Sequence, residues 1–364
     1  MSIKRLWTVG LVALLAGVGV LRGPEAFAAS NVSNVTFNGS SLVGGATADW
    51  TIGFKTGTGN GSALTAGSTI TVTFNGGFSE PNSPVVTLSG GFSGCTASSI
   101  AADGPSSGAD VVTVTLAGAG CALAKNTAGA LKLAGLTNAP VGTYSANNFT
   151  VSTSSDTNQV SAPSAITLTA GSASKLAFVQ GPSDGFVGTP LSPAITVQVQ
   201  DQVGNAVSGS GTTVTLTPST GAITSGATAT TDASGKATFS SVVINATALG
   251  ITLTASANGL TSTAASAAFN VTVAVSSGAA LTDTASDGGS GVKSVAYYYC
   301  TGYSGSCTSA NWTLIGSSTS AATNYQVSWT GQPANGAYRV VAIGTDNVTN
   351  VSQPSNSTPV SVTN

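Results

Sequence analysis

The sequence predicts an all-β protein built of tandem β-sandwich domains, and three observations point to that class. Apolar residues alternate with hydroxyl or amide residues in runs such as residues 69–74 (TITVTF) and 195–199 (ITVQV), which is the period of a half-buried strand. Asn-Gly and Asp-Gly pairs punctuate these runs as turns do. Charged residues make up only 6% of the chain, but Val, Ile and Thr are frequent, which favours strands over disorder.

Residues 1–28 are predicted to be a cleaved secretory signal peptide. A basic start (Lys4 and Arg5) precedes an apolar stretch at residues 8–21, which is too short for a good membrane span. Ala26-Phe27-Ala28 then matches the A-x-A cleavage pattern. An uncleaved anchor is the alternative. No later apolar run is long enough to cross a bilayer, so we expect no transmembrane segment after cleavage and a secreted, extracellular or cell-surface-associated protein.

The charge pattern excludes one class of partner. Residues 29–364 contain seven basic and eleven acidic side chains, and neither sign is clustered. A nucleic-acid-binding protein needs clustered Lys and Arg to neutralise phosphates. We therefore expect no nucleic-acid partner, and the same pattern disfavours adsorption to anionic lipid.

Four cysteines in an exported chain predict disulfide bonds. Four cysteines allow three pairings, and locality favours Cys95 with Cys121 and Cys300 with Cys307. A metal site is the alternative, but the chain has no histidine and neither pair has C-x-x-C spacing. No metal ligand is therefore assigned.

The first domain is predicted over residues 29–171. Its strand candidates are separated by turn signals such as Asn60-Gly61 and Asn75-Gly76. Cys95 and Cys121 lie just outside two of these strands, where a disulfide would staple the hairpin between them. The candidate strands are residues 32–37, 48–55, 68–74, 84–90, 110–118 and 147–153.

The second domain is predicted over residues 172–272 and carries a specific pattern. A strand at 175–180 (KLAFVQ) is followed by SPAITVQV at 192–199, which leads into an Asp-x-x-Gly-Asn turn at 201–205. A second turn and strand follow at 231–245 (TDASGKATFSSVVIN). The domain resembles the bacterial immunoglobulin-like repeats of surface adhesins and invasin-type proteins. The resemblance implies a β-sandwich that acts as a spacer or adhesive module and not as an enzyme.

The third domain is predicted over residues 273–364 and resembles another bacterial immunoglobulin-like repeat. The first half of the match lies in ASDGGSGVKSV (285–295), and the second in NGAYRVVAIGTDNVTN (335–350). Asn335 and Thr349 depart from the usual Asp and Gly of that family, which puts the tightness of the late turn in doubt. The predicted fold is thus three tandem immunoglobulin-like sandwiches after a signal peptide.

The residues that usually carry catalysis are missing or isolated. The absence of histidine removes Ser-His-Asp and Cys-His catalysis. Glycoside hydrolysis needs a pair of carboxyl groups, and Glu80, the only Glu after residue 28, is expected to be an exposed turn residue. We therefore expect no enzyme, no catalytic residue and no cofactor.

Two further kinds of site, for Ca²⁺ and for an isopeptide bond, compete with plain structural roles. Ca²⁺ needs six to eight oxygen ligands, whereas the single aspartates beside Gly, Asn or Ser are expected to cap turns. These are Asp201, Asp232, Asp283, Asp287 and Asp346. A Lys–Asn isopeptide bond needs a buried lysine beside a carboxyl group. Lys55, six residues from Asp49, and Lys175 are the candidates, and exposed lysines are the favoured interpretation.

Aromatic residues of the third domain are the candidate ligand-binding residues. Tyr297, Tyr298 and Tyr299 alternate faces on one predicted strand, so part of this set must face outward. Exposed Tyr and Trp rings can stack on sugar rings, which makes Tyr298, Tyr303 and Trp312 the candidates for carbohydrate contact. Trp329 and Tyr338 are expected to lie in the core.

The sequence therefore favours a secreted or cell-surface, non-enzymatic structural or adhesive protein whose immunoglobulin-like modules act as spacers. Its expected partners are cell-surface or matrix components, with polysaccharide among them. Self-association through strand edges is also expected to be possible, because the chain carries few charges to block edge pairing. The alternative function is a carbohydrate- or cell-wall-binding protein that uses the aromatic residues of the third domain.

Overall fold

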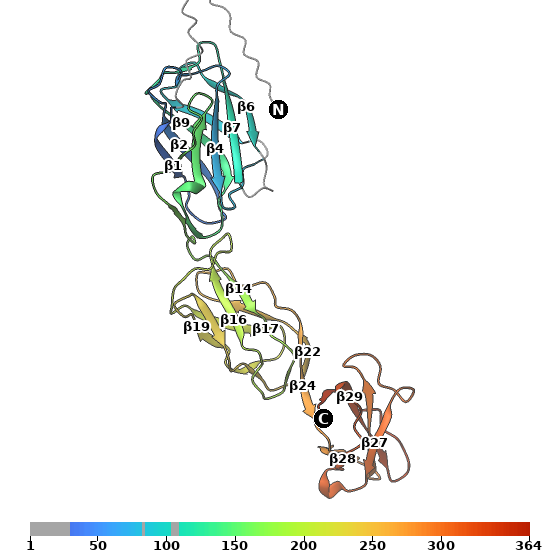
Figure 1. The fold of residues 1–364 in the computed structure, drawn as a ribbon. Helices are drawn as coiled ribbons and strands as arrows, with labels where there is room; N and C mark the ends of the chain where they lie inside the picture. Colours follow the sequence, from blue (N-terminus) through green and yellow to red (C-terminus); the bar gives the residue numbers. More distant parts are fainter. Residues whose placement is uncertain (1–29, 82–83, 103–108) are drawn as a thin grey trace, which may run out of the picture. The chain divides into compact units, whose positions relative to one another are not determined.

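A computed structural model describes residues 30–81, 84–102 and 109–364, and it confirms the predicted all-β class (Figure 1). These residues form strands β1 to β30 and two short 3-10 turns, with no α-helix among them. The predicted signal peptide and the Asp103-Gly104 turn lie outside the described residues. Within the described part of the chain, no helix is long and apolar enough to cross a membrane.

The chain divides into two compact units. The first comprises residues 1–42 and 46–167, and the second comprises residues 43–45 and 168–364. The first unit approximates the predicted first domain, whereas the second contains both of the other predicted domains. The division of residues 172–272 from 273–364 therefore stays a prediction.

The first unit is a sandwich of two antiparallel sheets. One sheet has the order β1-β2-β9-β5, with bounds Ser33–Gly39, Thr47–Lys55, Ala128–Thr137 and Val85–Gly90. The other has the order β12-β11-β4-β7-β6, with bounds Val160–Ser161, Phe149–Thr153, Thr69–Asn75, Ala109–Ala117 and Thr96–Ala102. Alternation places the larger apolar side chains of each sheet toward the other.

An aromatic cluster fills the space between these two sheets. The fully buried Trp50 on β2 packs edge-on against Phe74 of β4, with ring centroids 5.7 Å apart, and lies over Phe149 of β11 at 6.2 Å. The Trp50 indole Nε1 donates a hydrogen bond to Oδ1 of Asn138 at 2.9 Å. The one polar atom of the ring is thus satisfied inside an apolar core.

All six strands expected in the first domain are present, but two long strands were missed. Strand β9 reads AGALKLAGLT and β6 reads TASSIAA, and both are rich in Ala, Gly or Ser. Such residues have low strand propensity, so the sequence pattern did not predict a strand in either segment. Strand β9 is nevertheless an inner strand, paired with β2 on one side and β5 on the other. Its pairing therefore comes from tertiary context.

The second unit begins with a sandwich, here called the middle sandwich, that has one continuous core. Sheet β14-β16-β20 (Lys175–Gln180, Ile195–Gln200, Lys236–Phe239) faces sheet β19-β17-β23 (Thr228–Thr230, Thr213–Pro218, Leu253–Ser256). The alternating residues of 195–199 are buried in this core together with Val214, Leu216 and Phe239. The predicted core face of each strand is therefore the observed one.

The last part of the second unit is here called the C-terminal sandwich. Its larger sheet runs β24-β30-β29-β26-β27, with bounds Phe269–Val275, Thr358–Val362, Gly336–Asp346, Val292–Thr301 and Thr313–Ser318. Its smaller sheet pairs β25 (Ala279–Leu281) with β28 (Val327–Trp329). Strand β24 also pairs with β15 (Gly185–Phe186) and β22 (Ala248–Ile251), so it contributes Phe269 and Val271 to the middle core and Val275 to the C-terminal one.

Candidate functional site

The three consecutive tyrosines of β26 face two sides of the larger sheet. Tyr297 is buried, and Tyr299 packs against Trp329 and Tyr338 at centroid distances of 5.3 and 5.6 Å. These side chains belong to the inner face of the C-terminal sandwich. Trp329 is buried as expected, whereas Tyr338 is only half-buried. By alternation Tyr298 points to the opposite, outer face.

Tyr298 forms a small apolar surface with two neighbours. Its ring stacks on Trp312 with centroids 4.7 Å apart and an interplanar angle of 22°. Leu314 lies directly opposite Tyr298 in the β26–β27 register and is 58% exposed. We call Tyr298, Trp312 and Leu314 the aromatic platform. Each ring of the stack therefore limits the movement of the other.

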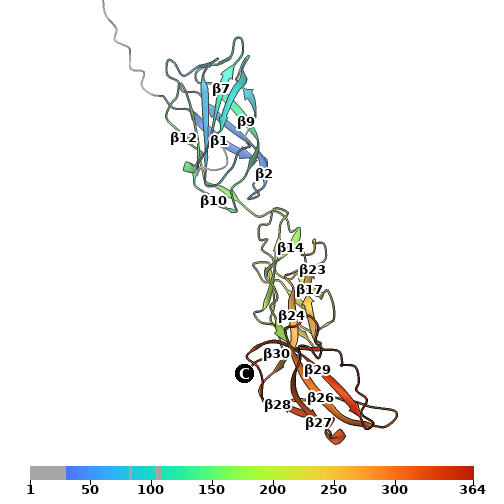
Figure 2. The same ribbon diagram turned by 90° about the vertical axis from the view of Figure 1, so that its right-hand side faces the viewer.

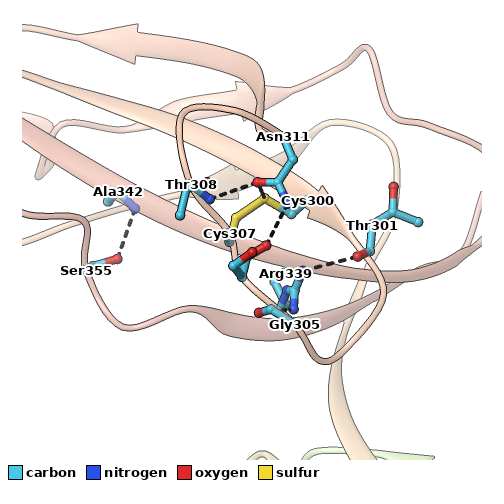
Figure 3. The surroundings of a disulfide bond; sticks show 10 residues. Cys300, Thr301, Gly305, Cys307, Thr308, Asn311, Arg339, Ala342 and Ser355 are labelled. Atoms are coloured by element: carbon cyan, nitrogen blue, oxygen red, sulfur yellow. Dashed lines mark hydrogen bonds between the residues drawn. A yellow bond between two sulfur atoms is a disulfide. The ribbon is translucent and has the colours of Figure 1, made fainter.

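The loop that carries Trp312 is fixed by a disulfide and by one asparagine (Figure 3). Cys300 at the end of β26 is bonded to Cys307, seven residues along the chain. Oδ1 of Asn311 accepts a hydrogen bond from the Thr308 amide at 2.8 Å, and its Nδ2 donates to the Ser306 carbonyl at 2.7 Å. These bonds tie the loop together just before Trp312.

A buried arginine of the larger sheet donates hydrogen bonds to backbone carbonyls of the same loop. Arg339 lies on β29 opposite Cys300 and is only 3% exposed. Its Nη1 donates to the Gly305 carbonyl at 2.6 Å and its Nη2 to the Thr301 carbonyl at 3.2 Å (Figure 3). Sequence reasoning missed this role. The signal was a single arginine, the only one after residue 28, in an otherwise apolar strand.

The other candidate binding residue, Tyr303, is engaged elsewhere. Its hydroxyl is hydrogen-bonded to the Ser361 hydroxyl of β30 at 2.5 Å, and the side chain is half-buried. The structure thus brings Tyr298 and Trp312 together in a stack and gives Tyr303 a contact with a different strand. Its expected role in ligand contact stays a prediction.

The second disulfide joins Cys95 to Cys121 in the first unit. Cys95 immediately precedes β6 and Cys121 follows β7, and these strands pair as an antiparallel hairpin. The bond closes that hairpin at its open end; strand β7 was among the predicted strands, whereas β6 was not. Both pairings are those that locality favours.

The aspartates beside turn residues bind backbone amides. Oδ1 of Asp201 accepts hydrogen bonds from the amides of Gly204 and Asn205, both at 2.8 Å, and its Oδ2 accepts one from the Gly171 amide at 2.8 Å. Asp346 caps the Val348 and Asn350 amides in the same way, at 3.0 and 2.7 Å. Over residues 30–81, 84–102 and 109–364, no group of three acidic, cysteine or histidine side chains is placed to hold a metal ion.

These bonds change the acidity of Asp201. Burial alone would raise the pKa of its carboxyl, but the hydrogen bonds from Gly171, Asn205 and Gly204 outweigh it and lower the pKa to about 2. The carboxylate is therefore charged throughout the physiological range. Side-chain and backbone donors at residues 234 and 236 likewise lower the pKa of Asp232.

Asp201 is expected to make the middle sandwich less stable in acid. Because its pKa is lower in the folded chain, its contribution to the free energy of unfolding is complete above the unfolded pKa of 3.8 and is lost as pH falls toward about 2. Asp201→Asn places an NH₂ group against N–H donors, so it should cost roughly 1–3 kcal/mol at neutral pH. Urea titrations from pH 7 to 2 test this, with the exposed Asp232→Asn as control. Equal losses in the two variants would contradict the assignment.

Two carboxyl groups of the first unit, those of Glu80 and Asp156, are buried. Glu80 was expected to be exposed, and this was wrong, since it is only 2% exposed. A bridge between Ser79 and Thr137 holds this segment against the end of β9. Asp156 is fully buried and accepts hydrogen bonds from the Gly57 amide and the Ser62 hydroxyl, both at 2.8 Å.

Two of the three residues considered for an isopeptide bond, Asp49 and Lys175, have other contacts. Asp49 forms an ion pair with Lys132, with 2.7 Å between Oδ2 and Nζ, and the hydrogen bond from Lys132 lowers the pKa of Asp49. Asp49 also accepts a hydrogen bond from the Gly135 amide at 3.1 Å. Nζ of Lys175 donates to the Gln202 carbonyl at 3.0 Å. Surface pairing therefore accounts for Asp49 and Lys175, and no contact links Asp49 with Lys55 in the described part of the chain.

Comparisons with known proteins give no family for this chain. No family model and no curated protein matches its sequence. Among solved structures it is similar to the Yersinia pseudotuberculosis adhesin InvE (16% identity, 68% of this chain and 61% of that one, TM-score 0.22). It is also similar to invasin, a bacterial integrin-binding protein (12%, 92% and 60%, 0.25), and to the pilus 2b backbone protein of group B streptococcus (11%, 90% and 89%, 0.24).

The class of the chain is therefore defined by its own strands. It is an all-β protein with paired sheets around separate hydrophobic cores and two local disulfides. TM-scores this low do not transfer a function, and this chain spans about three fifths of the InvE and invasin structures.

Proposed function

We propose that this chain is a non-enzymatic, secreted or cell-surface protein with a structural or adhesive role. Its immunoglobulin-like sandwiches act as spacers that present a binding site for a partner at a distance from the cell surface. Two disulfides suit an oxidising, extracellular location. Asp201 and Asp346 act as turn caps and Asp156 as a buried hydrogen-bond acceptor, which suits a structural role.

The observation that carries the proposal is the aromatic platform. Stacked Tyr298 and Trp312 with exposed Leu314 form a rigid apolar contact on a sheet face. The partner we propose is a cell-surface or matrix component. The second candidate, favoured by the same stack, is a polysaccharide whose sugar rings lie on the outer face of Trp312.

The platform is expected to control retention on cell walls. Tyr298→Ala/Trp312→Ala should lower the retained fraction of the chain by about tenfold, because an interface anchor contributes about 1.4 kcal/mol or more. The measurement is a pull-down on bacterial cell walls and on insoluble polysaccharides. The matched control is Phe186→Ala, which removes a partly exposed aromatic ring from the middle sandwich.

The outcomes separate the two candidates. Loss of retention on purified polysaccharide would establish carbohydrate binding by the platform. Loss on cell walls alone would establish a partner in the cell wall that the purified polysaccharides lack. Retention that is equal in the platform variant and in Phe186→Ala would contradict a contact role for the platform.

Strand edges offer a further route to assembly within the same proposed role. Strand β5 lies at the edge of its sheet, carries no charged residue and has Val85 66% exposed. Exposed edges with few charges favour pairing between chains. We therefore include pairing between copies of this chain through such edges in the proposed structural function.

A further inference from the structure

The first and last strands of the C-terminal sandwich pair in parallel. Strands β24 and β30 lie side by side (Figure 2), with Val273, Ala274 and Val275 opposite Val360, Ser361 and Val362 in the register. The Thr363 amide extends the contact with a hydrogen bond to the Val275 carbonyl at 3.0 Å. The strand by which the chain enters this sandwich is thus bonded directly to the strand by which it leaves.

This pairing decides how tension along the chain acts. Tension enters β24 at its N-terminal end, from the middle sandwich, and leaves β30 at its C-terminal end. In a parallel pair these two ends lie at opposite ends of the ladder. The strands are therefore pulled past each other, and their hydrogen bonds resist together instead of opening one at a time.

Side-chain hydroxyl groups cross-link the same pair. The Thr272 hydroxyl is buried and lies 2.7 Å from the Ser361 hydroxyl, within hydrogen-bond distance. The Tyr303 hydroxyl approaches the same Ser361 oxygen at 2.5 Å. One hydroxyl donates one hydrogen bond and accepts others, so Ser361 can satisfy both partners at once.

Tyr303 is itself firmly anchored. It lies inside the loop closed by Cys300–Cys307, and the Gly302 amide donates to the Ala337 carbonyl on β29 at 2.7 Å. A sliding movement of β30 would have to break the bond from this anchored phenol. The loop therefore ties β30 to β26 in addition to the backbone ladder.

We propose that the β24–β30 pair is a shear-loaded clamp that resists unfolding of the C-terminal sandwich under tension, with Tyr303 as its lock. The clamp gives the chain a mechanical role as a tether that stays folded under load. This property goes beyond the proposed adhesive function and is measured without any ligand, so either can fail without the other.

The test is single-molecule force spectroscopy on the whole chain. With handles at the two chain ends, opening of the C-terminal sandwich is recognised by a contour-length gain of roughly 250 Å, from about 3.4 Å per released residue. A second attachment uses a handle on Ser277→Cys, an exposed position just after β24, together with the C-terminal handle. This geometry pulls on the same ends of both strands and unzips the pair.

Unzipping is expected to require a lower force than end-to-end pulling, since the hydrogen bonds of the pair then break one at a time. End-to-end pulling of Tyr303→Phe should also unfold the sandwich at lower force than the unchanged chain. Tyr338→Phe is the matched control, because that hydroxyl bonds only the nearby Ala334 carbonyl among described residues. Equal forces in the two pulling geometries would overturn the clamp, and equal forces for the two tyrosine variants would overturn the lock.

Discussion

Trp50→Ala is expected to destabilise the first unit by about 3–5 kcal/mol, a large part of the stability of an ordinary domain. The indole is fully buried among Phe74, Phe149 and Phe78, and it satisfies the side-chain oxygen of Asn138. Its loss would leave a large cavity between two sheets that cannot collapse onto each other. Urea titration followed by far-UV circular dichroism measures the effect, and limited proteolysis shows which unit is lost.

Trp312→Ala is the comparison for that experiment. Trp312 is half-buried and contacts Tyr298 on an outer sheet face, so its removal should cost about 1 kcal/mol or less. Similar losses for the two tryptophans would show that the aromatic cluster is not the core of the first unit. A large loss for Trp50 with retained cell-wall binding would further show that the platform works independently of the first unit.

The second large effect is expected from the disulfides, and it should differ between them. Cys95→Ala/Cys121→Ala opens a loop of 26 residues, whereas Cys300→Ala/Cys307→Ala opens one of seven. In the chain-entropy model the first change costs about 3.5 kcal/mol and the second about 2.4 kcal/mol, because the longer loop restricts the unfolded chain more. Urea midpoints of the two variants measure this order.

The two disulfide variants should also differ in function. The Cys300–Cys307 loop presents Trp312 and anchors Tyr303, so its opening should weaken both cell-wall retention and mechanical resistance. Loss of Cys95–Cys121 should leave both unchanged, since that bond lies in the first unit. A reversed order of stability, or equal effects on retention, would contradict this division of roles.

Much of the fold could be predicted because strand alternation is a local property. The buried faces of residues 69–74 and 195–199 follow directly from their sequence, and so does the strand that runs from Phe269 to Val275. The turn caps were also predictable, because an aspartate can reach amides only a few residues away, as Asp346 does. The cysteine pairing was favoured for the same reason of short separation.

Other features depend on contacts between distant segments. Strand β9 has weak strand propensity and becomes an inner strand only through its neighbours β2 and β5. Glu80 was expected at the surface, but the bridge between Ser79 and Thr137 buries its segment. Neither the inner position of β9 nor the burial of Glu80 can be predicted from the neighbouring residues in the sequence.

For the candidate site, the residue pattern alone predicts that residues 297–299 present tyrosines on two faces and that a short disulfide loop follows. Which aromatic residues contact one another depends on the folded arrangement of the strands. Trp312 stacks on Tyr298 because β27 pairs with β26 in one particular register. The Tyr303 hydroxyl bonds the Ser361 hydroxyl because β30, which carries Ser361, pairs with β29 and so lies near the disulfide loop. Alternation fixes the face of each side chain, but only strand register and order set its neighbours.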